Sequence, residues 1–229
     1  MEVGVLPTCA VCGGSVFTDT QVLWSELIAE WELDAVEVDY IDRQQGTKCA
    51  DCGTNLRGCA LGSAISAFMG LTAPLRQLGA ESIRVLDLNG CQGVSDALAN
   101  LPNYQRHNYP QIDMHAMPFS DGAFDLVIHS DTLEHVEDPR QALRECMRVT
   151  AWRGAVIFTI PIIVGRLSRS RDNLPLSFHG APSFAGRQDF AVRTEFGADF
   201  WTYALQAGAS SITISTVEFP SAQAITLRP

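Results

Sequence analysis

Basic residues and long apolar runs are both scarce in this sequence. Lys and Arg total 16 against 26 Asp and Glu, which gives the 229-residue chain a formal net charge of -10. Proteins that bind nucleic acid through its phosphates are usually basic, so the negative net charge disfavours nucleic-acid binding. The longest apolar run, at 155–164, falls far short of the roughly 20 residues that span a bilayer. The N-terminus also lacks a basic start followed by an apolar segment, so we expect no signal peptide and a cytoplasmic location.

Cysteines give the first positive signal, because four of the seven form matching Cys-x-x-Cys-Gly segments at 9–13 and 49–53. A two-residue gap lets both thiolates of a tight turn face one ion, and the glycine permits the backbone turn that follows. Four thiolates leave no open coordination position, so we predict a structural Zn²⁺ site and not a catalytic one. The predicted ligands are Cys9, Cys12, Cys49 and Cys52. Four unrelated thiols or a redox pair are the alternatives.

The stretch between the two cysteine pairs has apolar residues at helical spacing over 21–33. We therefore expect residues 1–60 to form a zinc-binding module with one helix. The acidic composition of the chain and the lack of basic-aromatic clusters near these cysteines disfavour a nucleic-acid-reading module. The other cysteines, Cys59, Cys91 and Cys146, are expected to be small buried residues.

Residues 61–229 alternate between apolar runs and helical patterns. Runs typical of strands lie at 83–88, 103–113, 123–131, 153–163, 211–217 and 222–227. A helix is expected from Pro139 onward, with Asp138 as N-cap and Gln141 completing a capping box. The alternation predicts a doubly wound α/β domain with a mostly parallel sheet. Such sheets bind ligands beyond the carboxyl ends of their strands.

Residues 114–161 contain a specific series of short motifs. In order they are Met117-Pro118-Phe119, Asp121-Gly122, Phe124-Asp125, Leu133-Glu134-His135-Val136 and Asp138-Pro139. In order and spacing this series resembles the class I S-adenosylmethionine-dependent methyltransferases, particularly the type 11 group. The resemblance implies a Rossmann-like sheet of seven strands and S-adenosyl-L-methionine as cofactor. It also implies methyl transfer to a small-molecule acceptor, such as a sugar or another secondary-metabolite precursor, with oxygen expected as the acceptor atom.

The family's glycine-rich loop follows the first strand and reads Asp/Glu-x-Gly-x-Gly-x-Gly. Here the matching positions hold Asp87, Asn89, Cys91 and Gly93, and Gly90 lies between two of them. Asn tolerates the left-handed backbone of a tight turn, and the last glycine allows close packing. Cys91 departs from the pattern, because it stands where the backbone normally approaches the ligand.

The resemblance assigns further cofactor contacts after the next two strands. The family's acid for the ribose hydroxyls is missing, and Tyr109 or Gln111 is the expected substitute. Asp113 and Met114 are expected at the adenine. The set is completed by Ser130, Asp131 and His135.

An acceptor oxygen or nitrogen must lose a proton, and a positioned base accelerates such reactions by about 10² to 10⁴. His135 and His179 are the candidates, although a lone histidine is more often structural. Segment 163–193 is long for an α/β connection and is expected to be a lid or substrate-binding insertion. Its Arg166, Arg169 and Arg171 could clamp an anionic acceptor, or could lie on a solvated loop.

Three other functions are compatible with parts of the sequence. A catalytically degenerate methyltransferase domain could act as a scaffold that uses its zinc module for a partner, since the glycine-rich loop and ribose acid are altered. A nicotinamide dehydrogenase also has a glycine-rich loop, but the motifs of 117–139 argue against it. An RNA methyltransferase with a zinc reader is disfavoured by the net charge.

Overall fold

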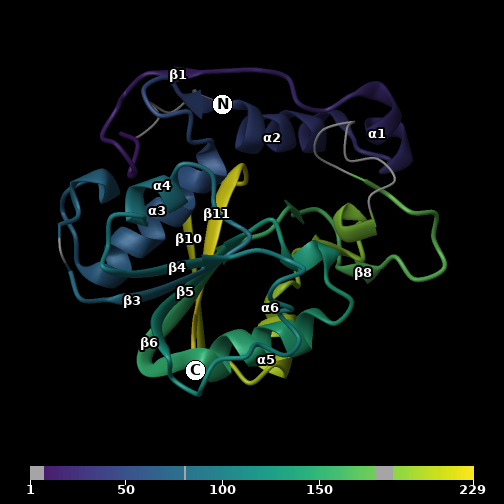
Figure 1. Cartoon of the computed structure of the whole chain (residues 1–229). Helices are drawn as coiled ribbons and strands as arrows, with labels where there is room; N and C mark the ends of the chain where they lie inside the picture. Colours follow the sequence, from purple (N-terminus) through teal and green to yellow (C-terminus); the bar gives the residue numbers. More distant parts are fainter. Residues whose placement is uncertain (1–7, 80, 179–187) are drawn as a thin grey trace.

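Six strands form the main sheet of a computed structural model that describes residues 8–79, 81–178 and 188–229 (Figure 1). Their order is β10-β11-β6-β5-β3-β4. The strands are β3 (Arg84–Leu88), β4 (Asn103–His107), β5 (Phe124–Ser130), β6 (Thr150–Thr159), β10 (Ser211–Glu218) and β11 (Ala222–Arg228). β3 to β6 run parallel, whereas β11 is antiparallel to both β6 and β10. The mostly parallel, Rossmann-like arrangement agrees with the prediction.

A seventh strand is not found in this sheet among the described residues, so the predicted count is wrong there. Residues 108–123, between β4 and β5, form turns and bends. Pro110 and Pro118 lie in this stretch and cannot donate ladder hydrogen bonds. The sheet therefore ends at β4.

Helices cover both faces of the sheet, as Figure 1 shows. Alternate strand residues point to opposite faces. Leu86 and Val127 pack on the side of α5 and α6, and their neighbours Val85 and Leu126 pack on the side of α3 and α4. The helices are α3 (Leu56–Met69), α4 (Val94–Leu98), α5 (Pro139–Val149) and α6 (Trp201–Gln206). No helix in the described ranges is long and apolar enough to cross a membrane.

The N-terminal segment contains two helices where one was expected. Its elements are β1 (Phe17–Thr18), α1 (Ser25–Glu30), α2 (Ala35–Gly46) and β2 (Lys48–Cys49). α1 covers only the middle of the predicted 21–33. α2 begins at Asp34, whose carboxylate accepts from the backbone amides of Val36 and Glu37 at 2.8 Å each. Glu37 accepts in turn from the Asp34 amide at 3.1 Å, so α2 has a complete capping box.

α3 joins the N-terminal segment to the sheet. It begins at Leu56, after Asn55 accepts from the Gly58 amide at 2.8 Å, so the expected boundary at residue 60 lies inside a helix. Leu56 belongs to the same buried cluster as Cys9 and Val85. The hydrophobic core therefore runs from the cysteine pairs into the sheet without a break.

The described part of the 163–193 insertion contributes to a small three-stranded sheet of order β7-β9-β8. The strands are β7 (Ile162–Ile163), β8 (Arg169–Ser170) and β9 (Thr194–Gly197). Single 3-10 turns complete the described elements: η1 (Leu75–Gln77), η2 (Leu133–His135) and η4 (Gln188–Phe190). Ile163 and Val192 pack with Leu27 and Trp31 of the N-terminal segment, so the insertion and the first helices share a third core cluster.

Candidate active site

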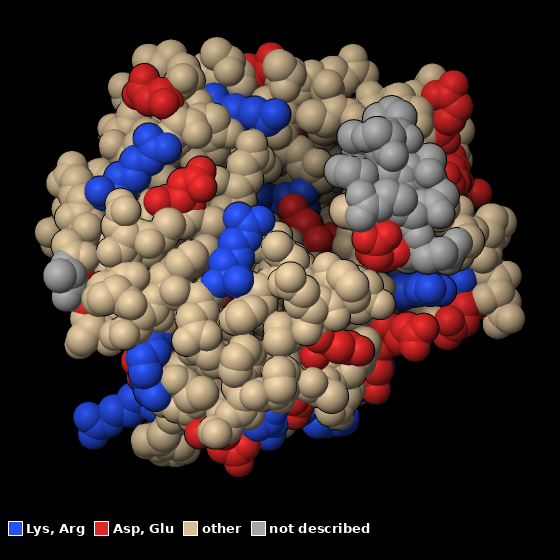
Figure 2. Space-filling model, in the orientation of Figure 1, with Lys and Arg blue, Asp and Glu red and all other residues tan. Residues whose placement is uncertain are grey.

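A cleft of about 640 Å³ lies beyond the carboxyl ends of β3, β4 and β5. The three strands end at one level because Leu88 on β3 lies opposite His107 on β4 and His129 on β5. The surface is hollowed near the centre of the face in Figure 2. The predicted cofactor residues that line the cleft are Asn89, Tyr109, Asp113, Met114, Ser130, Asp131 and His135. The others do not line it: Asp87, Gly90, Cys91, Gly93 and Gln111.

Loop 89–93 adopts the tight turn that its sequence predicts. Asn89, Gly90 and Gly93 have left-handed φ values of 66°, 82° and 74°. The Asn89 amide donates to His107 O at 2.9 Å, and the Asn89 side chain accepts from the Tyr109 amide at 2.7 Å. The loop is thereby fixed to the end of β4.

Asp87 supports this loop and does not line the cleft, so its predicted cofactor contact is corrected. Its buried carboxylate accepts from Ser95 Oγ at 2.5 Å, Tyr104 Oη at 2.6 Å and the Gly90 amide at 3.1 Å. The Cys91 side chain is also buried, with Sγ 3.8 Å from Asp87 Oδ1. Burial and the Asp87 charge raise the Cys91 thiol pKa. Cys91 therefore does not obstruct the cleft.

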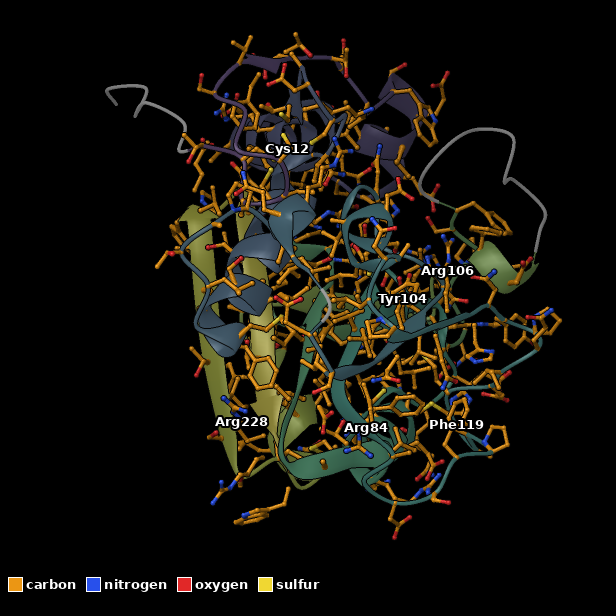
Figure 3. The ribbon with its side chains drawn as sticks, turned by 60° about the vertical axis from the view of Figure 1, so that its left-hand side comes forward. Cys12, Arg84, Tyr104, Arg106, Phe119 and Arg228 are labelled. Carbon is orange, nitrogen blue, oxygen red and sulfur yellow. The ribbon has the colours of Figure 1, made fainter. Side chains whose placement is uncertain are left out.

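Arg106 lines the cleft near the end of β4, just before the stretch 107–113 in which the resemblance led us to look for the ribose acid. A Cβ on Gly90 would meet the movable guanidinium of Arg106, and the left-handed φ of 82° is the stronger reason for glycine at this position. Arg106 and Tyr104 lie on the same side of β4 (Figure 3). Gln111, one predicted substitute for the ribose acid, is exposed outside the cleft, whereas Tyr109 lines it.

Asp113 also lines the cleft, and its carboxylate is held by His115. It accepts from the His115 amide at 2.9 Å and lies 2.7 Å from His115 Nδ1. The hydrogen bond from the His115 amide is the largest cause that lowers the pKa of Asp113. Met114 beside it is buried, as an apolar contact for a flat ring requires.

Sequence reasoning missed Arg57, although an arginine inside the small-residue helix after the second cysteine pair was a visible signal. Arg57 is only 2% exposed, and its Nη1 lies 2.7 Å from Asp131 Oδ1. Burial raises the pKa of Asp131, and the Arg57 charge opposes that shift. Burial, followed by the charge of Asp131, raises the pKa of Glu134 well above its ordinary value. A buried cation and two acids thus lie together at the cleft, and Asp131 forms part of its lining.

His135 is placed to accept a proton. Its Nδ1 lies 3.2 Å from Ala191 O, and a carbonyl can only accept, so Nδ1 carries the hydrogen. Nε2 is then the basic nitrogen, 3.6 Å from Glu134 Oε1. Burial lowers the pKa of His135, which keeps the ring neutral near pH 7. The other predicted base, His179, lies outside the described residues.

The three arginines of the insertion bind protein acids, which corrects their prediction as an anion clamp. Arg166 donates to Glu37 at 2.6 and 2.9 Å, and its pKa is raised by that hydrogen bond. Arg169 donates to Glu195 at 2.6 and 3.1 Å. Arg171 is buried and also pairs with Glu195. These arginines fix the insertion to itself and to the N-terminal helices.

A second cavity of about 550 Å³, here called the chamber, lies between α1, α2 and the insertion. Its apolar lining comes from both sides: Val22, Leu23, Trp24, Leu27, Trp31, Leu33, Ile41, Pro161, Ile162, Ile163, Val192 and Phe196. Its polar lining is Gln44, Gln45, Lys48, Gln92, Glu134, Thr194 and Glu195. The chamber was not predicted, because its two walls come from segments far apart in the sequence.

The four predicted metal ligands come together. All four sulfur atoms lie within 4.8 Å of one another. Sγ of Cys9 is 3.7 Å from Cys52, and Sγ of Cys12 is 3.5 Å from Cys49. A tetrahedral site with Zn–S bonds of about 2.3 Å requires sulfur atoms about 3.8 Å apart, which these donors fit. Figure 3 shows Cys12 above the sheet.

The second cysteine pair touches the glycine-rich loop directly. A Cβ on Gly93 would overlap Thr54 Oγ1, so this glycine admits the cysteine turn and not only the following helix. The Gln92 side chain donates to Gly53 O at 3.3 Å. The turn of the second cysteine pair therefore supports the glycine-rich loop at the edge of the cleft.

Residues 66–158 match the family described as a methyltransferase domain. This segment runs from within α3 to the end of β6 and is less than half of the chain. Two curated relatives match shorter stretches. Malonyl-acyl-carrier-protein O-methyltransferase of Halorhodospira halophila is 50% identical over 46 residues, which is 20% of this chain and 16% of that protein. Ajmaline N-methyltransferase of Rauvolfia serpentina is 41% identical over 58 residues, 25% of this chain and 20% of that protein.

Solved methyltransferase structures are also similar. A SAM-dependent methyltransferase from Thermotoga maritima shares 11% identity over 76% of this chain and 89% of its own, with a TM-score of 0.44. A second similar chain comes from the complex between the Haloferax volcanii Trm112 methyltransferase activator and a methyltransferase. It shares 13% sequence identity over 89% of this chain and 95% of its own length, with a TM-score of 0.42.

Proposed function

We propose that this protein is an S-adenosylmethionine-dependent methyltransferase that acts on a small molecule. The observation that carries the proposal is the coincidence of two findings. The segment that matches a methyltransferase domain, 66–158, contains the strands whose ends form the 640 Å³ cleft. Parallel α/β sheets bind their ligands at this edge.

The cleft residues suit the parts of that cofactor. Asp113 and Met114 offer a carboxylate and an apolar side chain for the adenine, and Asn89 and Tyr109 offer polar groups for the ribose. The cofactor supplies an activated methyl group on a good leaving group. The protein then has to align the acceptor and exclude water.

His135 is the proposed general base for an acceptor oxygen. Its Nδ1 lies 3.2 Å from Ala191 O, which leaves Nε2 as the basic nitrogen of the neutral ring. Since burial lowers its pKa, we expect activity to persist below the pH at which an exposed histidine would become protonated. A pH profile of kcat/KM for wild type and His135→Gln tests this, and an acid limb that the variant leaves unchanged would exclude His135 as the base.

A structural Zn²⁺ bound by Cys9, Cys12, Cys49 and Cys52 is part of the same proposal. The sulfur separations support it, and the described cysteines are all free thiols. Free thiols fit a reducing compartment, so we place the protein in the cytoplasm. One zinc per chain by elemental analysis, lost in a Cys9→Ser/Cys12→Ser double variant, is the expected result.

The deciding experiment is calorimetric titration of the zinc-loaded protein with S-adenosylmethionine and S-adenosylhomocysteine. We expect both to bind, and Asp113→Ala to weaken both because it removes the adenine-side carboxylate. Asp121→Ala is the matched control, since Asp121 is 82% exposed and outside the cleft.

A degenerate scaffold is the second candidate, favoured by the altered glycine-rich loop and by Tyr109 and Arg106, which line the cleft near the place where the resemblance implies a ribose acid. Failure of both ligands to bind a protein shown to be folded would support that reading. The search would then turn to a partner of the zinc module.

A further inference from the structure

The chamber is lined by the only lysine of the chain. Lys48 lies between α2 and the proposed zinc ligand Cys49, and it contributes to the chamber wall. It forms no salt bridge with an acid anywhere in the described ranges. The hydrogen-bond donors of its ammonium group are therefore not used by protein carboxylates.

Two glutamine side chains near the end of α2 also line the chamber. Gln44 and Gln45 precede Lys48 by a few residues, and Gln44 is only 3% exposed. Neither side-chain amide forms a hydrogen bond with another residue of the described structure. Because buried amides require hydrogen-bonding partners, these side chains favour a ligand with a polar end.

The rest of the chamber wall is mainly apolar. Leu27, Ile163 and Val192 belong to a buried cluster, against which Trp24 and Ile41 pack. The cavity of about 550 Å³ lies in the range of roughly 300–1,000 Å³ that holds small ligands. A ligand that fills this space must bury an apolar body against these side chains.

The two acids of the chamber lining do not neutralise Lys48. Glu195 accepts from Arg169 at 2.6 and 3.1 Å and also pairs with the buried Arg171. Burial raises the pKa of Glu134 well above its ordinary value, which holds this side chain toward its neutral form. Among the described lining residues, Lys48 is thus the charge left without a counter-charge, and it favours a single negative charge on the ligand.

We propose that the chamber binds a monocarboxylate with an apolar body. The carboxylate accepts hydrogen bonds from the Lys48 ammonium and from the side-chain amides of Gln44 and Gln45. The apolar body lies against the cluster that contains Leu27 and Trp24. A single ammonium group matches the single charge of a carboxylate better than the double charge of a phosphate monoester.

The chamber lies next to the cleft, because loop 89–93 contributes to both. Asn89 lines the cleft, and Gln92 lines the chamber. The proposal concerns binding alone, however, and does not rest on the methyltransferase function. Titration with S-adenosylhomocysteine tests that function separately, so either proposal can fail without the other.

Calorimetric titration of the full zinc-loaded chain with 2-naphthoate and with 2-naphthamide tests the preference for a carboxylate. The two compounds share the same rings and a planar carbonyl substituent, and they differ in charge. We expect 2-naphthoate to bind at least about tenfold more tightly, because only the carboxylate forms an ion pair with Lys48. Equal affinities, or no binding of 2-naphthoate, would overturn the proposal.

Substitutions at Lys48 and Ile41 separate the polar part of the site from the apolar part. Lys48→Met keeps the apolar stem and should abolish the preference for 2-naphthoate while leaving 2-naphthamide affinity unchanged, whereas Lys48→Arg should keep the preference. Ile41→Gln should weaken both ligands about tenfold. Val36→Gln is the control on the same helix, at a site that is 69% exposed, and should change neither. A preference that survives Lys48→Met, or affinities that Ile41→Gln leaves unchanged, would refute the site.

Lys48 also provides a direct signal in the protein without substitution. Because the chain has one lysine, reductive methylation with isotope-labelled formaldehyde gives one lysine resonance in NMR spectra, and the dimethylated amine keeps its positive charge. This resonance should shift on titration with 2-naphthoate, with the same affinity that calorimetry gives. A resonance that does not move at saturation would show that the carboxylate binds elsewhere and would overturn the proposal.

Discussion

Glu134 ties proton binding to stability at the scale of single residues. Its pKa is raised by burial and then by the charge of Asp131, so the folded protein keeps a proton that the unfolded chain releases just above the ordinary value of 4.5. The folded state binds more protons in this window, and the free energy of unfolding falls as pH rises through it.

Glu134→Gln removes this titration while keeping the shape of the side chain. The variant should gain stability relative to wild type as pH increases above about 5, measured by urea unfolding. Glu137→Gln, at an exposed site three residues along the chain, is the control and should show no such trend. A pH-independent difference for Glu134→Gln would contradict the assigned cause.

Asp87 carries a different prediction, because it holds the glycine-rich loop through three hydrogen bonds. Asp87→Asn replaces one carboxylate oxygen, which accepts hydrogen bonds, with an NH2 group, which donates them. This NH2 group would face the groups that donate to Asp87 in the wild type. We expect a loss of about 2–3 kcal/mol in the free energy of unfolding, with Asp172→Asn at an exposed site as control. A loss below about 0.5 kcal/mol would show that the loop can rearrange around the amide.

The sequence could predict some individual side chains, and the reason differs from case to case. Asn89 was predictable because a tight turn needs a left-handed backbone, which few residues tolerate. Asp87 was misassigned because the motif shows where an acid stands but not which donors surround it. Arg57 was missed because its partner, Asp131, is distant in the sequence.

At the scale of elements, the contact between the turn of the second cysteine pair and loop 89–93 makes the proposed zinc site a support for the cleft. Thr54 fills the space above Gly93, and Gln92 donates to Gly53 O. Removing zinc should therefore loosen the loop before it unfolds the sheet.

Cys52→Ser tests that coupling. We expect affinity for S-adenosylhomocysteine to fall by about tenfold or more, and amide exchange in 89–93 to quicken, while β5 and β6 stay protected. Cys146→Ala, on the other face of the sheet, keeps all four ligands and should not change exchange in the loop. Slow exchange in a zinc-free, folded variant would refute the coupling.

Elements with strong local signals matched their predictions. Asp138 caps α5 and Pro139 opens it, as expected, but Gln141 donates to His115 O and does not close a capping box. β8 escaped prediction because a strand of two residues shows no periodicity, whereas β7 lies at the end of the predicted strand run 153–163.

For the whole molecule, the sheet and its ligand-binding edge could be read from the alternation of strands and helices, whereas the chamber could not. Its walls depend on contacts such as Trp31 Nε1 donating to Ser177 Oγ at 2.7 Å, across most of the chain. Sequence periodicity reports which face of an element is buried but not which distant element covers it.

Arg43 on α2 and Glu218 on β10 form a two-bond ion pair that spans the chain, with both distances at 2.7 Å. Both side chains are 26% exposed, so solvent weakens the pair only in part. Glu218→Gln should lower the free energy of unfolding by about 1 kcal/mol. A double-mutant cycle with Arg43→Met isolates the pair, and a coupling energy near zero would show that packing alone joins these elements.

The packing of α3 limits the order in which parts of the chain can fold. This helix leaves the second cysteine pair and packs on β11, the last strand. During synthesis the apolar side of α3 therefore stays partly uncovered until β11, more than 150 residues further along the chain, has left the ribosome.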